Sequence, residues 1–160
     1  VVQHGPWPAR TAAAARHRHR VPLWRYVLEG DVATALTAPL IYALVVPFAL
    51  LDVAVSLYQA LCFRAWGIRR VRRRDYFAID RHRLRYLNLL ERLNCLYCSY
   101  ANGLIAYVRE IAARTEQYWC PIRHARLTRG AHRRSREFAA YGDAGAYHEH
   151  LPGYRAALKR

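Results

Sequence analysis

The chain has 160 residues, a formal net charge of +15 and a hydrophobic content of 54%. This length leaves room for one compact domain, or for one membrane element followed by a small helical unit. The excess of positive charge predicts an anionic partner, and no P-loop, dinucleotide-binding fingerprint, nucleophile elbow or HExxH motif points to a reaction. We therefore expect a protein that is not itself an enzyme.

The first segment, residues 1–31, is a basic leader that contains proline, alanine and histidine. It lacks the charged stub, apolar core and small-residue cleavage site of a secretory signal peptide. We expect it to be largely disordered, because it has too little apolar surface to form a core.

The segment from Val32 to Phe63 is apolar, and Asp52 is its only carboxylate. About 20 apolar residues suffice to cross a bilayer as a helix, so this segment predicts a membrane element. We favour a single crossing from about Pro39 to Cys62 with a kink at Pro47, and the alternative is a re-entrant helical hairpin that turns at Pro47. Asp52 is either a functional or partner-contact residue inside the membrane or a residue near its interface.

An arginine-rich linker, residues 64–75, follows the apolar segment. Its arginines are predicted to bind anionic lipid headgroups: Arg64, Arg69, Arg70, Arg72, Arg73 and Arg74. Because loops rich in arginine tend to stay on the cytoplasmic side, we expect a bacterial-type inner membrane with the C-terminal part of the chain in the cytoplasm.

The next segment, residues 76–124, predicts a long amphipathic helix from about Arg81 to Trp119, with Asp80 as its N-cap and Pro121 after its end. Apolar residues recur along this helix in steps of three and four, which forms a heptad-like stripe. Because the apolar segment is also expected to be helical, the sequence predicts an all-α protein. We predict that this stripe meets a second copy, another subunit or the membrane surface, and the alternative is an ordinary core within the chain. The stripe consists of Tyr86, Leu90, Leu93, Tyr97, Tyr100, Leu104, Tyr107 and Ile111.

A possible metal site lies in the same segment, where Cys95 and Cys98 form a C-x2-C pair and, after 21 intervening residues, Cys120 and His124 form a C-x3-H pair. Three cysteines and a histidine are a known ligand set for zinc, and an iron–sulfur cluster is the alternative cofactor. Thiol redox chemistry and simple packing are the other interpretations. One ion can bridge the two pairs only if the helix folds back near Gly103 or if two chains meet.

Two carboxylates of the helix, Glu110 and Glu116, lack a histidine three residues later, so we expect them to pair with Arg109 and Arg114. The remaining residues, 125–160, form a basic tail, with a short C-terminal helix expected at about 134–141 and a second helix near the end as an open alternative. Its arginines are also candidates for headgroup contact.

Together these features predict a small membrane-anchored accessory or assembly subunit of a membrane protein complex, with a possible structural metal site. A redox-active membrane protein with an iron–sulfur centre or a reactive dithiol is the first alternative. A membrane-tethered nucleic-acid-binding protein is the second, and it is the less favoured one because lipid is the nearer anion.

Overall fold

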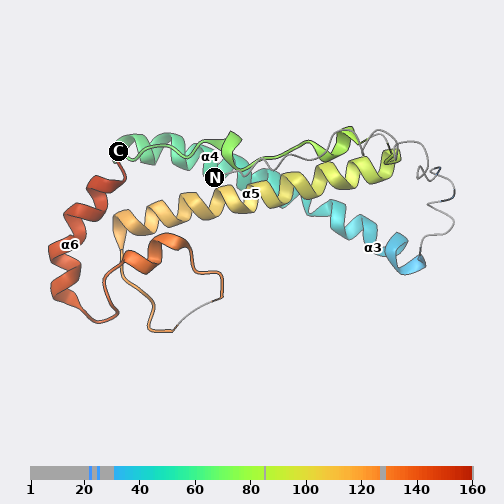
Figure 1. Cartoon of the computed structure of the whole chain (residues 1–160). Coiled ribbons are helices and arrows are strands. Elements are labelled where there is room, and N and C mark those ends of the chain that lie inside the picture. The colour runs from blue at the N-terminus through green and yellow to red at the C-terminus, as the bar shows by residue number, and fades with distance from the viewer. Residues whose placement is uncertain (1–21, 23–24, 26–30, 85, 127–128, 160) are drawn as a thin grey trace, which may run out of the picture. The chain divides into compact units, whose positions relative to one another are not determined.

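The computed structural model describes residues 22, 25, 31–84, 86–126 and 129–159, so the predicted leader lies almost wholly outside the described residues. The helices in chain order are α3 (Val32–Ala43), α4 (Val45–Tyr58), the π-turn η1 (Gln59–Phe63), α5 (Leu89–Trp119) and α6 (Ala144–Ala157) (Figure 1). Short 3-10 turns lie at η2 (Arg73–Asp75), η3 (Arg81–Arg83) and η4 (Arg133–Glu137). The described residues contain no β-strand, so the prediction of an all-α fold is confirmed.

The contacts divide the chain into two compact units, which we describe separately. The first unit comprises Val1–Ala49 and Arg74–Leu104, and the second comprises Leu50–Arg73 and Ile105–Arg160.

The apolar segment is helical apart from one turn residue, and Val32–Phe63 is long and apolar enough to span a membrane. Asp31 caps its start by accepting a hydrogen bond from the backbone N–H of Ala33. A turn at Leu44 separates α3 from α4, which fits the absence of an N–H on Pro47 to donate to the carbonyl of residue 43. Pro47 lies inside the first turn of α4, so the chain does not reverse there and the hairpin alternative is wrong for this structure.

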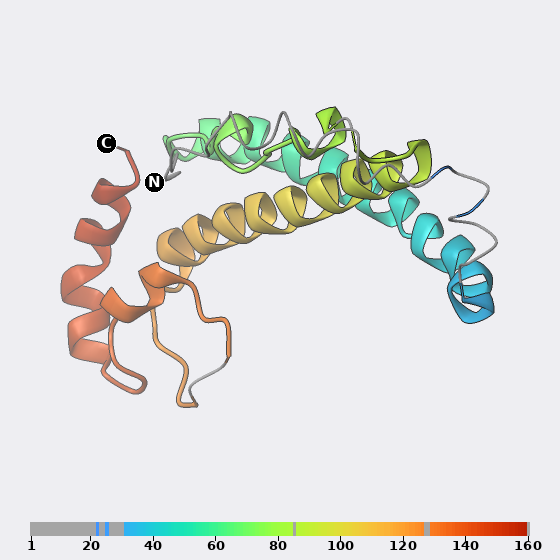
Figure 2. The ribbon, with the colours of Figure 1, turned by 45° about the vertical axis from the view of Figure 1, so that its right-hand side comes forward.

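Helix α5 begins later than the sequence analysis predicted. Its start is a capping box, in which the backbone N–H of Glu91 donates to Asn88 Oδ1 at 2.9 Å and the N–H of Asn88 donates to Glu91 Oε2 at 2.8 Å. The predicted N-cap, Asp80, instead precedes η3 and makes no capping hydrogen bond with its side chain. Figure 2 shows α5 as one continuous helix, without a break at Gly103.

Aromatic contacts hold the first unit together. The ring of Tyr97 in α5 lies 6.1 Å from that of Tyr42 and 6.4 Å from that of Phe48. Further along α5, the ring of Tyr100 lies 6.1 Å from that of Phe77 in the preceding loop. These contacts bury part of the predicted stripe against α3, the start of α4 and the loop.

In the second unit, the residues that follow η1 contact the end of α5 and the C-terminal end of α6. Phe63 and Ile68 are buried, the ring of Trp66 stacks on that of Tyr118 with centroids 5.3 Å apart, and the backbone N–H of Arg69 donates to the carbonyl of Leu158. Helix α6 lies near the end of the chain, where a second helix was an open alternative, and the helix predicted at about 134–141 is wrong. Residues 133–137 form the turn η4 instead.

Candidate functional site

Within the second unit, α4 and η1 have one face of exposed apolar side chains. Leu50, Val53, Leu57 and Leu61 are spaced by three or four residues, as on one face of a helix, and their exposed fractions are 67%, 60%, 57% and 69%. The core helix of a soluble protein would bury such a row. Of the most apolar window of Val32–Phe63, only 6% is buried.

The opposite face has polar residues that point into the chain. Asp52 accepts a hydrogen bond from Arg73 Nη2 at 2.7 Å, and Ser56 Oγ donates to Asp52 at 3.5 Å. Gln59, which is 1% exposed, donates from Nε2 to the hydroxyl of Tyr107 at 2.7 Å and accepts from the backbone N–H of Val71. The polar groups of this helix are therefore satisfied inside the chain, and its apolar groups face outward.

This arrangement is the reverse of the one that water favours, because a surface helix of a soluble protein turns its apolar face inward. It is the arrangement expected in a bilayer, where polar residues face the protein interior and pair with one another. The sequence analysis missed the inward roles of Ser56 and Gln59, although their spacing from Asp52 indicates one helical face. Asp52 has a partner in its own chain, Arg73, and both interpretations of its depth in a membrane stay open.

The six arginines predicted to bind headgroups are all exposed, but one of them also has a structural role. Arg73 forms an ion pair with Asp52, and its guanidinium lies 6.0 Å from the ring centre of Tyr107. The other five arginines are exposed as well, and the binding of headgroups by these arginines stays a prediction.

The predicted metal ligands are not brought together. Cys95 and Cys98 lie within α5 and Cys120 follows its last residue, so 25 positions separate Cys95 from Cys120. At about 1.5 Å per residue, an unbroken helix of this length keeps them on the order of 37 Å apart. Among the described residues no group of three or more His, Cys, Asp and Glu side chains is placed to hold a metal ion. The metal site stays a prediction, and within this fold it would need a second chain.

The predicted partner stripe divides into two parts. Its later members, Leu104, Tyr107 and Ile111, are at most 3% exposed and belong to the core of the chain, as the alternative interpretation held. Near the start of α5, Leu93 is 49% exposed, and Tyr86 just before the helix is 39% exposed. Only this early part of the stripe offers surface to another molecule.

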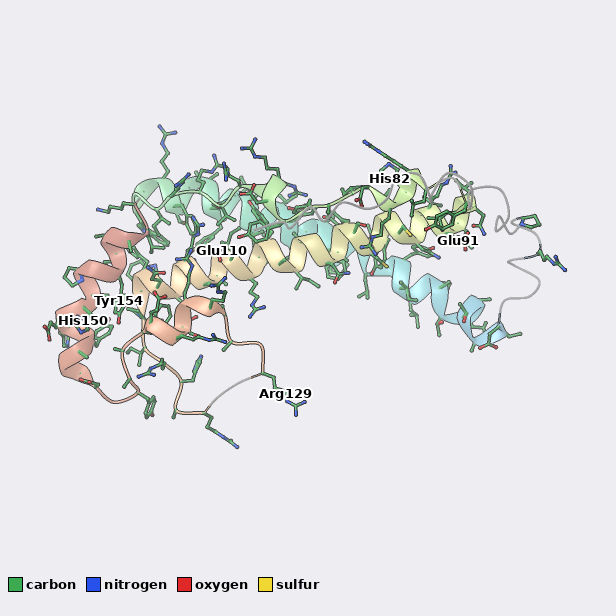
Figure 3. The ribbon with its side chains drawn as sticks, viewed as in Figure 1. His82, Glu91, Glu110, Arg129, His150 and Tyr154 are labelled. Atoms are coloured by element: carbon green, nitrogen blue, oxygen red, sulfur yellow. The ribbon has the colours of Figure 1, made fainter. Side chains whose placement is uncertain are left out.

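A charged network links α5 to η4 and α6 in the second unit. Glu110 accepts hydrogen bonds from Arg114 Nε at 2.8 Å and from Arg134 Nη2 at 2.7 Å. Arg134 also donates to Gln117 Oε1 at 2.9 Å, and Gln117 donates to the carbonyl of Tyr154 at 2.9 Å. Figure 3 labels Glu110 on α5 and Tyr154 on α6. The expected Glu110–Arg114 pair is present, whereas Glu116 bonds His132.

Burial alone would raise the pKa of Glu110, but hydrogen bonds from Arg114 and Arg134 and their positive charges outweigh burial and lower it below its ordinary 4.5. A carboxylate with a depressed folded-state pKa contributes stability above its unfolded pKa and loses that contribution as the pH falls through the folded value. We therefore expect acidification below about pH 4.5 to weaken the second unit.

The variant Glu110→Gln should lose about 1–3 kcal/mol of unfolding free energy at pH 7, because hydrogen bonds to a charged group are lost. Its stability should also fall less on acidification than that of the wild type. Denaturant unfolding in detergent at several pH values measures both effects. Equal acid sensitivity in the two proteins would show that Glu110 does not contribute to it.

Comparisons of the chain with models of known protein families, with curated protein sequences and with solved structures find no match.

Proposed function

We propose that the protein is a membrane-anchored accessory or assembly subunit of a membrane protein complex, and that Val32–Phe63 is its anchor. The observation that carries this proposal is the reversed polarity of α4 and η1. Their polar residues bond within the chain, while Leu50, Val53, Leu57 and Leu61 face outward. Lipid acyl chains are the surroundings in which such an outward face carries no cost.

The flanking charge supports an orientation. Exposed arginines directly follow the apolar helix and would contact anionic headgroups, each worth about 1 kcal/mol near the surface. By the positive-inside tendency, this arginine-rich flank would face the cytoplasm of a bacterial-type cell.

The early part of α5 supports the subunit role. Leu89, Leu93 and Leu96 share one helical face in the first unit and are 64%, 49% and 41% exposed. An exposed apolar row of this kind favours contact with another protein chain, either a second copy or a different subunit.

The anchor is tested by adding two carboxylates to its outward face. In the variant Val53→Asp/Leu57→Asp, each aspartate should cost about 2.5–3.5 kcal/mol inside a bilayer, so the chain should leave the membrane pellet in alkaline carbonate. The control Ala106→Asp/Ala112→Asp makes the same charge change at exposed positions of α5 and should stay in the pellet.

Release of the wild-type chain by carbonate, or retention of both variants, would contradict the anchor. In a mild detergent, a native gel should show the wild-type chain in a particle larger than a single chain. A lone chain in that gel would contradict the subunit role while leaving the anchor intact.

A further inference from the structure

The second unit contains a cationic pocket of about 540 Å³, which is lined by residues of the segment that joins α5 to α6. Its polar lining comes from four basic side chains and two hydroxyls: Arg123, His124, Arg126, Arg136, Ser135 and Tyr141. Ala125, Gly130, Ala131 and Ala140 complete the lining, and no carboxylate of a described residue belongs to it. This volume lies in the range of small-molecule sites.

Backbone hydrogen bonds hold the two sides of the pocket together. The N–H of Arg123 donates to the carbonyl of Ala139 at 2.8 Å, and the N–H of Ala139 donates to the carbonyl of Pro121 at 3.0 Å. From α5, Arg109 Nη2 donates to the carbonyl of Ala131 at 2.9 Å and also to that of Gly130. These hydrogen bonds fix the backbone from which the arginine side chains of the pocket extend.

The basic residues of this region divide into two groups. Arg134 pairs with Glu110 and His132 with Glu116, so each has a carboxylate partner. Among the described residues, no ion pair joins Arg123, Arg126 or Arg136 to a carboxylate. Three guanidinium groups thus share one pocket without a counter-charge, although like charges at close range repel.

We propose that this pocket binds the phosphate group of a small anionic ligand. Guanidinium groups bind phosphate oxygens in bidentate pairs, and the hydroxyl of Tyr141 can donate a further hydrogen bond to the same oxygens. The hydroxyl of Ser135 already donates to the carbonyl of His132. The ligand's negative charge would relieve the repulsion among the arginines. His124, predicted from the sequence as a metal ligand, lies here among arginines, and these surroundings favour an anion over a cation.

The test is titration of the purified full-length chain in a non-ionic detergent with glycerol 3-phosphate, followed by calorimetry. Binding in detergent does not depend on the membrane anchor, so failure here and failure of the anchor can be told apart. The variant Arg123→Gln/Arg136→Gln should bind on the order of a hundredfold more weakly, about tenfold for each arginine.

The control Arg129→Gln/Arg133→Gln removes the same charge from exposed arginines that do not line the pocket. Figure 3 shows Arg129 on the loop and pointing away from the helices. This control should bind as the wild type does. Absence of saturable binding by the wild type, or an equal loss in both double variants, would overturn the proposal.

A second arm identifies the source of the phosphate. The chain is reconstituted in phosphatidylcholine nanodiscs with and without phosphatidic acid, and glycerol 3-phosphate is titrated again. Weaker apparent binding in the presence of phosphatidic acid would show that a lipid headgroup occupies the pocket. Unchanged binding would assign the pocket to a soluble phosphate ester.

Discussion

Replacing Gln59 with leucine is expected to destabilise the protein by about 2–4 kcal/mol, because two buried hydrogen bonds are lost and their partners remain. The backbone N–H of Val71 would lose its acceptor, and the hydroxyl of Tyr107 would lose its donor. Both residues are at most 5% exposed, so water cannot easily replace the lost partner. Denaturant unfolding in detergent measures the change.

A control separates the two bonds. Tyr107→Phe removes the bond between the two side chains but keeps the bond from Val71 to Gln59, and it should cost about 1 kcal/mol. The double variant Gln59→Leu/Tyr107→Phe should cost less than the sum of the single variants, because the two residues share one interaction. An increase in stability with leucine, as expected where an apolar helix has no polar contact to satisfy, would contradict the inward role of Gln59.

Replacing Gly103 with alanine is expected to destabilise the first unit by about 1–3 kcal/mol, even though alanine favours helices. A Cβ at this position of α5 would lie 2.9 Å from Phe77 Cδ1 and 3.0 Å from the carbonyl oxygen of Tyr76. The backbone of the loop at Tyr76 cannot move aside as cheaply as a flexible side chain. Thermal unfolding of the variant gives the size of the effect.

Gly153 in α6 is the matched control for this substitution. A Cβ there meets nothing within 4 Å, so Gly153→Ala should raise stability by up to about 1 kcal/mol. Stabilisation by both substitutions would show that the loop at Phe77 does not pack tightly on α5.

The sequence alone predicts the helical fold and the end of α5, because these depend on local signals. Val32–Phe63 has apolar residues over its whole length, and Pro121 stops the helix before it. The start of α5 also had a local signal, the capping box of Asn88 and Glu91. It was missed because the heptad-like stripe continues back to Tyr86, before the helix begins. Gly103 looked like a break but serves as a close contact with the loop.

Helix α6 could be anticipated only as a further helix near the end of the chain, without bounds, because its own residues are poor helix formers. It contains Pro152 and two glycines, and tertiary contacts offset this weakness. Arg155 donates from Nε to the carbonyl of Tyr118 at 3.0 Å, and its guanidinium lies 4.9 Å from the ring centre of Tyr118. Such contacts join residues far apart in the chain, so no local pattern predicts them.

The two candidate sites could be predicted only in part. The spacing of Asp52, Ser56 and Gln59 indicates a polar face, but the partners Arg73 and Tyr107 come from tertiary structure. Likewise, the arginines of the tail are evident in the sequence. Which basic residues pair with a carboxylate and which line the pocket depends on the positions of Glu110 and Glu116 in the folded chain.

The central claim is that the outward face of α4 and η1 contacts lipid acyl chains. Its most direct test is photo-crosslinking in native membranes, with a benzophenone amino acid placed at Leu57 or Leu61 and, as a control, at the exposed Ala106 of α5. Mass spectrometry should find acyl-chain adducts at Leu57 and Leu61 and none at Ala106. Adducts to protein alone at Leu57 and Leu61, or lipid adducts at all three positions, would contradict the claim.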